Sequence, residues 1–590
     1  MIFERSDRPV SGAWSRCILA IVFVCWVAAE ACASWIPDGV PISSAASLQT
    51  AAQIVSDGSG GAIITWEDNR DPVSFPWDIY AQRIDANGNV LWTTDGVPIC
   101  TAESNQQYPQ LVTDGSGGAI ITWEDRRGAY HDIYAQRIDA DGNVLWTDDG
   151  VLVSARQNTK YTPQLVADGS GGAIIAWEDH KGSGVPQWHD IFAQRITADG
   201  ERDWTVDGIP VCSFDEAQRD IQLAQDGTGG AIIVWQDQRN FNDPIDHGHY
   251  GYDIFAQRVE ADGGLSWDLD GVAISVTVGE QRKPQLVAVD GGGAIITWED
   301  CRISGDHNNP NIYAQLVAAN GTVMWTVDGV PASSVAWWQK DPQLISDGSG
   351  GAIIAWNNDS GSIDIFAQRI QANGNLAWAA TGVRLSSEQS TQYDPQLVSD
   401  GSGGAIIAWS EWPLSSSPDI FVQRINEDGY LQWTSSGISI SSASDRQQYP
   451  QLVSDGYGGA IITWEDWRIS GISNKDVYAQ STTALDMSAV GDPEMSGTFA
   501  AMPLAFPNPF GESTAISWSM DRKGGNATLD VFDLSGKRIR RLTSGYLGVG
   551  RHVRQWSGKD SQGRQVSSGT YFYRLQTGSE VRTGRMVLTR

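Results

Sequence analysis

Cysteine is scarce in this sequence. Only six of the 590 residues are cysteines, and three of those lie before residue 33, in a segment that we expect to be removed. The other three, Cys100, Cys212 and Cys301, are too few and too widely spaced for the disulfide framework of a small secreted scaffold. We therefore expect unpaired thiols that hold no metal.

Histidine and positive charge are also scarce. None of the seven histidines has HExxH spacing, and the one close pair, His247 and His249, lacks a defined third metal ligand. Charged residues make up 19% of the chain, and 71 Asp and Glu outnumber 40 Lys and Arg. A net charge of -31 repels nucleic acid and anionic lipid, so we expect neither as a partner.

Long apolar runs are missing apart from residues 17–29, which are too few to span a bilayer. A basic start precedes this run, and small residues follow it at 31–33. That order is typical of a secretory signal, so we predict a signal peptide over residues 1–33. The alternative, a lipoprotein acylated at Cys32, is disfavoured by Glu30.

Glycine (64 residues) and tryptophan (26) are abundant, and they belong to a repeat. One unit recurs at spacings of 53 to 63 residues, a period typical of propellers and solenoids. Each copy is anchored by one tryptophan: Trp66, Trp123, Trp177, Trp235, Trp298, Trp356, Trp409 and Trp464.

Each unit contains four short β-type runs. In the first unit these are residues 53–56, 62–66, 78–84 and 90–99. Runs one and two, and runs three and four, are joined by turns of Asp, Asn and Gly typical of hairpins. The connection between runs two and three varies, because the anchor Trp precedes the third run by 8 residues in one unit and 18 in another. Antiparallel strands alternate in direction, so we expect the variable connections on one face.

The two ends of the repeated region complete each other. The eighth unit stops after residues 476–480 without a fourth run, whereas residues 35–42 (WIPDGVPI) match the fourth run at 92–99 (WTTDGVPI). We predict an all-β fold in which residues 34–485 form an eight-bladed propeller closed by the N-terminal strand. An open solenoid is the alternative.

Sixteen of the 26 tryptophans occupy two repeated positions, where we expect them to pack between blades. Six others lie in the variable connections, where an indole can stack on a sugar ring or anchor a protein partner. The alternative is that they pack beneath their own loops. These candidate ligand-binding residues are Trp77, Trp188, Trp337, Trp338, Trp412 and Trp467.

Acidic residues often follow the anchor Trp, as in Glu67 and Asp68, and an arginine such as Arg70 comes next. A ring of such carboxylates can bind Ca²⁺, the one cofactor considered. We favour a pairing of these acids with their own arginine or with a third-run arginine such as Arg83, as contacts between blades. The reason is that one unit has Asn357 and Asn358 in place of the acidic pair. A framework contact can vary in this way, whereas a ring of metal ligands cannot.

No catalytic constellation stands out. Paired carboxylates of a glycoside hydrolase remain open, because the 62 acidic residues between 34 and 503 make some close pair inevitable.

The repeat ends at a linker, residues 486–503, and the charge then inverts. Residues 504–590 carry 14 Lys and Arg against 6 Asp and Glu. Alternating runs with glycine turns predict a β-sandwich. The motifs FPNPF (506–510), LDVFDLSG (529–536) and SGTYFYRL (568–575), in this order, resemble the FlgD-like immunoglobulin fold and the type IX secretion (Por) C-terminal sorting domains.

The resemblance implies that an outer-membrane secretion machinery recognises residues 504–590. A purely structural immunoglobulin-like domain is the alternative. We predict a secreted or cell-surface binding or adhesion protein without catalysis, whose variable face contacts a glycan or protein ligand. The alternatives are an extracellular carbohydrate-active hydrolase that uses loop carboxylates and a purely structural surface protein.

Overall fold

The computed structural model describes most of the chain after residue 34. The described ranges are residues 35–70, 76–180, 188–240, 251–303, 309–335, 337–386, 390–413, 417–468, 474–484, 504–506, 513–520, 525–534, 536–548, 550–577 and 580–589. They contain 39 β-strands, one short 3-10 helix (Thr482–Ala484) and no α-helix. Nowhere in these ranges is a helix long and apolar enough to cross a bilayer.

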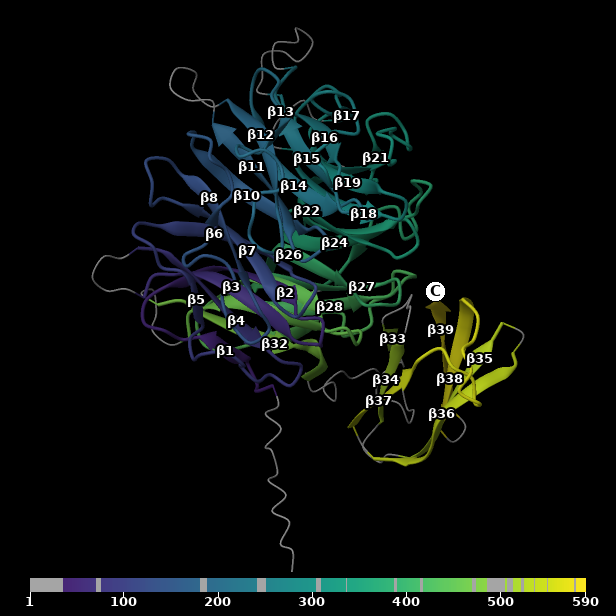
Figure 1. The fold of residues 1–590 in the computed structure, drawn as a ribbon. Helices are drawn as coiled ribbons and strands as arrows, with labels where there is room; N and C mark the ends of the chain where they lie inside the picture. Colours follow the sequence, from purple (N-terminus) through teal and green to yellow (C-terminus); the bar gives the residue numbers. More distant parts are fainter. Residues whose placement is uncertain are drawn as a thin grey trace, which may run out of the picture. The chain divides into compact units, whose positions relative to one another are not determined.

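The described repeats form eight four-stranded antiparallel sheets, here numbered sheet 1 to sheet 8 in chain order (Figure 1). Sheet 1 contains β2 (Gln49–Ser56), β3 (Ala62–Asp68), β4 (Asp78–Ile84) and β5 (Val97–Cys100), paired in that order. Sheets 2 to 7 repeat this order with β6 (Gln106–Thr113), β7 (Ala119–Asp125), β8 (Asp132–Ile138), β9 (Val151–Leu152); β10 (Lys160–Ala167), β11 (Ala173–His180), β12 (His189–Ile196), β13 (Ile209–Cys212); β14 (Gln218–Gln225), β15 (Ala231–Asp237), β16 (Asp253–Val259), β17 (Val272–Ser275); β18 (Gln281–Val289), β19 (Gly293–Asp300), β20 (Asn311–Val317), β21 (Val330–Pro331); β22 (Trp338–Ser346), β23 (Ala352–Asp359), β24 (Ile363–Ile370), β25 (Val383–Arg384); and β26 (Thr391–Ser399), β27 (Ala405–Trp412), β28 (Asp419–Ile425), β29 (Ile438–Ser441).

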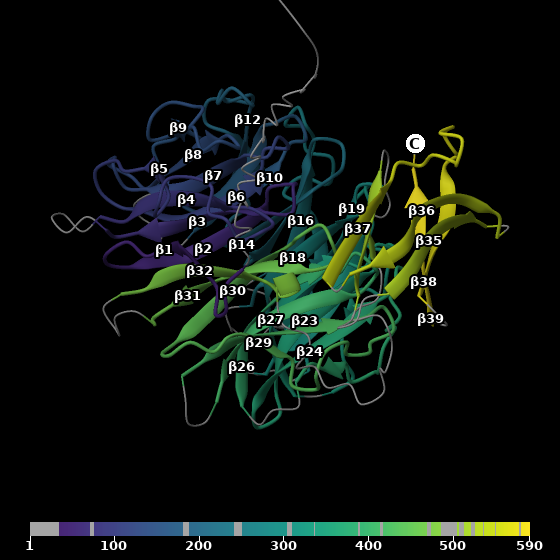
Figure 2. The same cartoon turned by 90° about the horizontal axis from the view of Figure 1, so that it is seen from below.

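Sheet 8 differs from the others in where its fourth strand comes from. It joins β30 (Gln447–Ser454), β31 (Ala460–Asp466) and β32 (Asp476–Ser481) to the N-terminal strand β1 (Val40–Ser43). Val40 lies opposite Ala479 in this antiparallel pair. Figure 1 and Figure 2 both show purple β1 and β2 beside green β32.

The first tight turn is an Asx turn in seven of the eight repeats; in sheet 5 the backbone N–H of Gly292 instead donates to the carbonyl of Val289. In sheet 1 the Asp57 carboxylate accepts hydrogen bonds from the N–H groups of Ser59 and Gly61, each at 2.8 Å. Gly58 and Gly60 have φ of 74° and 90°, a left-handed backbone that glycine adopts without steric cost. The expected hairpin between the first two strands is therefore present.

Neighbouring sheets pack through their second strands. Every residue of β3 is buried, as in a strand covered on both faces. Ile63 of this strand shares a core with Ile121 and Trp123 of sheet 2. The second repeated tryptophan also links sheets, because the Trp92 indole N–H donates to the carbonyl of Ala140 at 3.1 Å. The repeated tryptophans thus pack between sheets, as expected.

The register defines two different ends of each sheet. In sheet 1, Gln49 pairs with Asp68, and Asp68 pairs with Asp78. The start of the first strand, the end of the second and the start of the third thus lie together. We call this the variable end, because the connections of variable length leave the sheet there; the tight turns lie at the opposite end.

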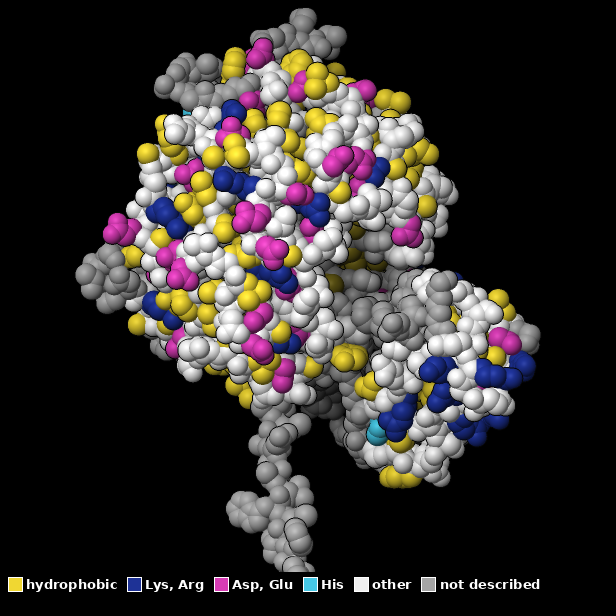
Figure 3. Space-filling model, viewed as in Figure 1, with side chains coloured by type: hydrophobic (Ala, Val, Ile, Leu, Met, Phe, Trp, Pro, Cys, Tyr) yellow, Lys and Arg dark blue, Asp and Glu magenta, His cyan; other side chains and the backbone are white. Residues whose placement is uncertain are grey.

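The C-terminal residues form a separate all-β region. One sheet has the order β33 (Leu504–Phe506), β34 (Thr514–Met520), β37 (Gly550–Trp556), and the other has β36 (Arg538–Leu547), β35 (Gly525–Asp533), β38 (Gly569–Thr577), β39 (Glu580–Leu588). Trp518 and Trp556 from the first sheet share a core with Leu529 and Tyr573 from the second. Lys and Arg side chains gather on the face of this region seen in Figure 3.

Removal of the N-terminal strand tests its contribution to sheet 8. We expect deletion of residues 34–44 to lower the melting temperature markedly, because Ile42, 2% exposed, lies in a core with Trp66 and Val477. The milder change Ile42→Ala should cost about 2 to 5 kcal/mol of unfolding free energy. Thermal and denaturant unfolding measure both, with Ser44→Ala, at an exposed position, as the control. An unchanged melting curve after the deletion would favour the open solenoid.

Candidate ligand-binding site

An aromatic and ionic cluster fixes the end of the second strand. The Trp66 indole N–H donates to Asp68 at 2.8 Å, and Arg70 binds the same carboxylate through two nitrogens, at 2.8 and 2.5 Å. The guanidinium lies 3.7 Å from the ring centroid of Tyr80, which stacks on Trp66. The expected pairing of the acid with its own arginine is present, and it recurs at Trp123, Trp235, Trp298 and Trp464.

The third-strand arginine has a different partner from the expected one. Arg83 pairs with the turn carboxylate of Asp57 at 2.8 Å rather than with the acids after the anchor Trp. It also donates to the carbonyl of Ala140 in the next sheet at 2.7 Å. The arginine therefore does link sheets, but through the backbone and at the tight-turn end.

In seven of the eight sheets the residue directly after the anchor Trp connects the sheet to the next at the variable end; in sheet 6 the side-chain oxygen of Asn357 has no hydrogen-bond partner among the described residues. Glu67 accepts the N–H of Tyr108 in sheet 2 at 2.7 Å, and Glu465 accepts the N–H of Ala51 in sheet 1 at 2.9 Å. Tyr108 and Ala51 have φ of 57° and 53°, at a bulge of the first strand. We call this contact the inter-sheet tie; its other acceptors are Glu124, Glu178, Gln236, Glu299 and Ser410.

These ties account for the repeated glutamates. No group of three or more His, Cys, Asp or Glu side chains in the described ranges is arranged to hold a metal ion. The pair His247 and His249 lies outside the described residues. Cys100, Cys212 and Cys301 are buried, and none of the three forms a disulfide bond with another described residue.

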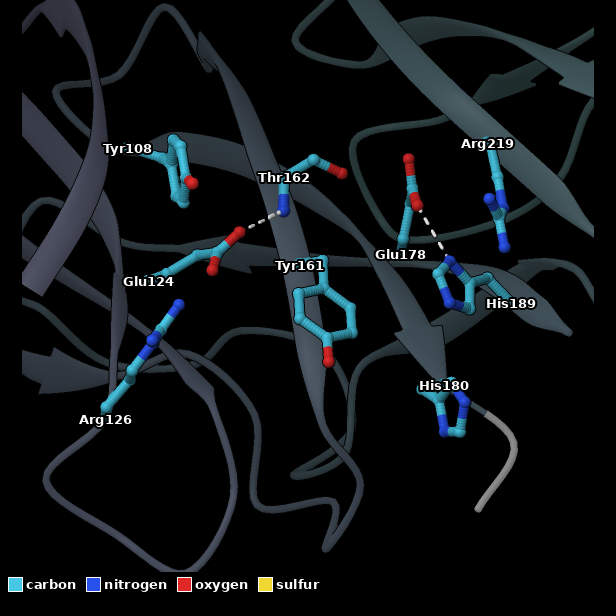
Figure 4. Close-up of a pocket in the computed structure, with 9 residues that line it drawn as sticks. All are labelled: Tyr108, Glu124, Arg126, Tyr161, Thr162, Glu178, His180, His189 and Arg219. Atoms are coloured by element: carbon cyan, nitrogen blue, oxygen red, sulfur yellow. Dashed lines mark hydrogen bonds and ion pairs between the residues drawn. The ribbon is translucent and has the colours of Figure 1, made fainter. Parts of the chain in front are cut away.

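A pocket of about 580 Å³ opens at the variable ends of sheets 2, 3 and 4 (Figure 4). Strands β6, β7, β10, β11, β12 and β14, with the residue after β7, supply its lining. The lining residues are Tyr108, Glu124, Arg126, Tyr161, Thr162, Glu178, His180, His189 and Arg219.

Glu124 is the carboxyl group of the pocket that exchanges a proton near neutrality. Its pKa is raised from 4.5 to about 7, mainly by burial and to a smaller extent by the negative charges of Glu178 and Glu67. The hydrogen bond from Thr162 N–H, at 2.8 Å, and the charge of Arg126 act in the opposite direction. The buried Nε of Arg126 has no hydrogen-bond partner among the described residues, which leaves this donor available to a ligand.

His180, His189 and Tyr161 of the pocket and the nearby His131 are in contact through their rings. His131 meets the edge of Tyr161 at a centroid separation of 5.4 Å, and Tyr161 stacks on His189 at 5.7 Å. His180 lies on the other side of His189, at 5.4 Å, and the Nδ1 of His189 is 2.9 Å from an oxygen of Glu178. Burial lowers the pKa of His131, with a smaller contribution from Arg126.

The six tryptophans predicted to bind a ligand do not line this pocket. Trp337 and Trp338 are 54% and 41% exposed, next to and at the start of β22. The other four are partly buried; Trp412 packs edge-on against Tyr393, and the ammonium group of Lys475 lies 5.2 Å from the ring of Trp467. All six occupy variable ends of their sheets, and their role in binding stays a prediction.

The pocket residues are not among the candidates predicted from the sequence, because the residue types at their positions change between repeats. Arg126 and His180 share one position, three residues after the anchor Trp, which is Asn69 in sheet 1. His189 immediately precedes the aspartate of the third strand, a position held by Trp77 in sheet 1. Both positions change from repeat to repeat while the anchor Trp does not, so a column-by-column comparison would have indicated them.

Among the parts of this chain, comparison with known proteins matches only the C-terminal region to a family model. Residues 507–580 match the model of the FlgD Ig-like domain, in agreement with the resemblance read from the motifs. No match was found among curated proteins. The repeat region is not assigned to a family.

Several solved structures are similar to this chain at low identity and low TM-score. The polysaccharide lyase Uly1 is 11% identical, over 67% of this chain and 92% of that chain, with a TM-score of 0.40. The Penicillium chrysogenum alpha-L-arabinanase is 13% identical, over 54% and 93%, with a TM-score of 0.32. PorZ of Porphyromonas gingivalis, a surface component of its type IX secretion system, is 11% identical, over 91% and 81%, with a TM-score of 0.27. Identities and TM-scores this low support no inference about the ligand or the reaction of this protein.

The raised pKa of Glu124 makes stability depend on pH. Between pH 4.5 and about 7 the folded state binds more protons at this site than the unfolded state, so the stabilising effect of the protonated form is lost as pH rises. We expect Glu124→Gln, which keeps the carbonyl acceptor for Thr162, to stabilise the protein at pH 8 by up to about 3 kcal/mol and to have little effect at pH 4. Paired denaturant titrations across this range measure the difference, and a constant difference would contradict the assignment.

Proposed function

We propose that this protein is secreted or displayed on the cell surface and binds a glycan or protein ligand at the variable ends of an eight-bladed propeller. The pairing of β1 with β32 and the tie from Glu465 to Ala51 support a closed ring. We propose residues 34–485 as the propeller and residues 486–503 as the linker.

The contrast between fixed and varied positions is the observation that carries this proposal. The buried framework of the second strand recurs in every sheet, whereas Arg126, Tyr161, His180, His189 and Arg219 occupy positions that differ from repeat to repeat. Packing alone explains why the framework recurs in every sheet. It does not explain why polar and aromatic side chains of different kinds converge on one pocket, an arrangement typical of a binding site.

Export through the C-terminal region is the second part of the proposal. A signal peptide at residues 1–33 would deliver the chain across the inner membrane, and residues 504–590 would then be recognised by an outer-membrane secretion machinery of the type IX kind. The FlgD Ig-like match over residues 507–580 and the excess of Lys and Arg after residue 504 support this assignment.

A carbohydrate-active hydrolase is the second candidate function. The observation that favours it is Glu124, whose pKa of about 7 suits a general acid, close enough to Glu178 for the two charges to interact. Binding is preferred because Glu178 has both oxygens engaged, one by the N–H of Asp220 at 2.8 Å and one by His189.

Glycan arrays and binding to extracted surface proteins test the binding function on the chain from residue 34 onward. We expect saturable binding that Arg126→Ala weakens at least tenfold, because the variant removes the unpaired donor of the pocket. The double variant Trp337→Ala, Trp338→Ala tests the predicted tryptophans separately. Glu201→Ala, an exposed change at the tight-turn end of sheet 3, is the matched control. If no ligand saturates, a purely structural role is favoured.

Hydrolysis assays on the same glycans separate the two candidates. The binding proposal predicts no release of reducing ends by the parent chain at pH 5 to 8. Turnover that disappears in Glu124→Gln, while binding persists, would instead establish the hydrolase.

Secretion of truncated chains tests the role assigned to residues 504–590. In a host with type IX secretion, we expect the full chain in the medium or on the surface and the chain ending at residue 503 inside the cell. Equal export of both chains would leave the C-terminal region with a structural role only.

A further inference from the structure

Two histidines of the pocket form a cross-strand pair. His180 ends β11 and His189 begins β12, and the two residues are directly opposite in this antiparallel pair. Opposite residues place their side chains on the same face of a sheet, with Cβ atoms roughly 4.5 to 5.5 Å apart. The ring centroids are 5.4 Å apart, and the ring planes meet at 64° (Figure 4).

This separation is compatible with a shared metal ion. A Zn–N bond of about 2.1 Å places the ion about 3.2 Å from each ring centroid, so two imidazoles at a tetrahedral angle have centroids about 5.2 Å apart. We propose that His180 and His189 chelate one divalent transition-metal ion of the zinc or copper class at the edge of the pocket. Neutral imidazole is a preferred ligand of these ions.

Glu178 and Tyr161 hold His189 in the orientation that such binding needs. The Nδ1–H of His189 donates to one oxygen of Glu178, and the other oxygen accepts the N–H of Asp220. A carboxylate acceptor on Nδ1 keeps the proton there and leaves the lone pair of Nε2 for a metal. Tyr161 stacks on the same ring with an interplanar angle of 25°. Glu178 is therefore a positioning residue, outside the coordination sphere.

The proposed site leaves coordination positions open. The described residues provide no third His, Cys, Asp or Glu placed to complete a metal cluster with this pair. Water, or an oxygen or nitrogen atom of a molecule in the pocket, would fill the remaining positions. An open coordination sphere in a pocket that Arg126 also lines suits a ligand with an anionic or hydroxyl group.

The experiment uses metal alone, so its result is independent of the proposed function. The parent is the untagged chain from residue 34 with His247→Gln and His249→Gln, which removes the other close histidine pair. We expect calorimetry with Zn²⁺ to show one ion per chain and the electron paramagnetic resonance spectrum with Cu²⁺ to show coupling to two nitrogens. His180→Gln and His189→Gln should each weaken affinity at least tenfold, and Glu178→Gln should weaken it roughly tenfold.

His131→Gln is the matched control, because this histidine contacts the same Tyr161 ring without belonging to the pair. It should bind metal as the parent does. Zn²⁺ should also raise the melting temperature of the parent and leave that of His180→Gln unchanged, a comparison that remains informative if the His189 variant folds poorly. Parent-like affinity in His180→Gln, coupling to a single nitrogen, or no thermal shift in the parent would each overturn the proposal.

Discussion

The repeat region depends on one hydrogen bond, the inter-sheet tie. The faces of neighbouring sheets meet through hydrophobic packing, which is not directional. Polar contacts at the strand ends are therefore needed to fix the angle between one sheet and the next. The tie supplies direction, because the acceptor follows the anchor Trp on a rigid central strand and the donor is an N–H at a bulge of the neighbouring sheet. Its recurrence from Glu465 to Ala51 gives the last and first sheets the same contact as the six other neighbouring pairs of sheets that have it.

A tie made to the backbone places no demand on the side chain that carries the donor N–H. Tyr108, Thr162 and Asp220 are different residues that donate through the same atom. The framework places no demand on the side chains at the neighbouring positions of the variable end either. A repeat of this kind can therefore change its surface chemistry sheet by sheet while its geometry stays constant, and the pocket of sheets 2 to 4 illustrates this freedom.

Much of the fold could be predicted from the sequence because its signals are local or identical between repeats. The Asp-Gly turns, the anchor tryptophans and the match of residues 35–42 to 92–99 each specify structure without knowledge of distant contacts. The partner of Arg83 could not be predicted in this way, since Asp57 and the acids after Trp66 are equally acidic and only the register distinguishes them. The pocket could not be predicted for a related reason: Tyr108, Tyr161 and Arg219 come from strands of three different sheets, and they are far apart in the sequence.

The carboxylates of the pocket also limit what chemistry it can perform. Glu124 and Glu178 belong to inter-sheet ties, so an oxygen used for catalysis would have to come from a group that already holds two sheets together. Glu178 has no oxygen to spare, and Glu124 has one. A nucleophile or general acid must present a free oxygen to its substrate, whereas recognition can use the guanidinium of Arg126, the tyrosine rings and the histidine pair without disturbing a tie. The same contact that joins two sheets therefore leaves Glu178 without a free oxygen at this site.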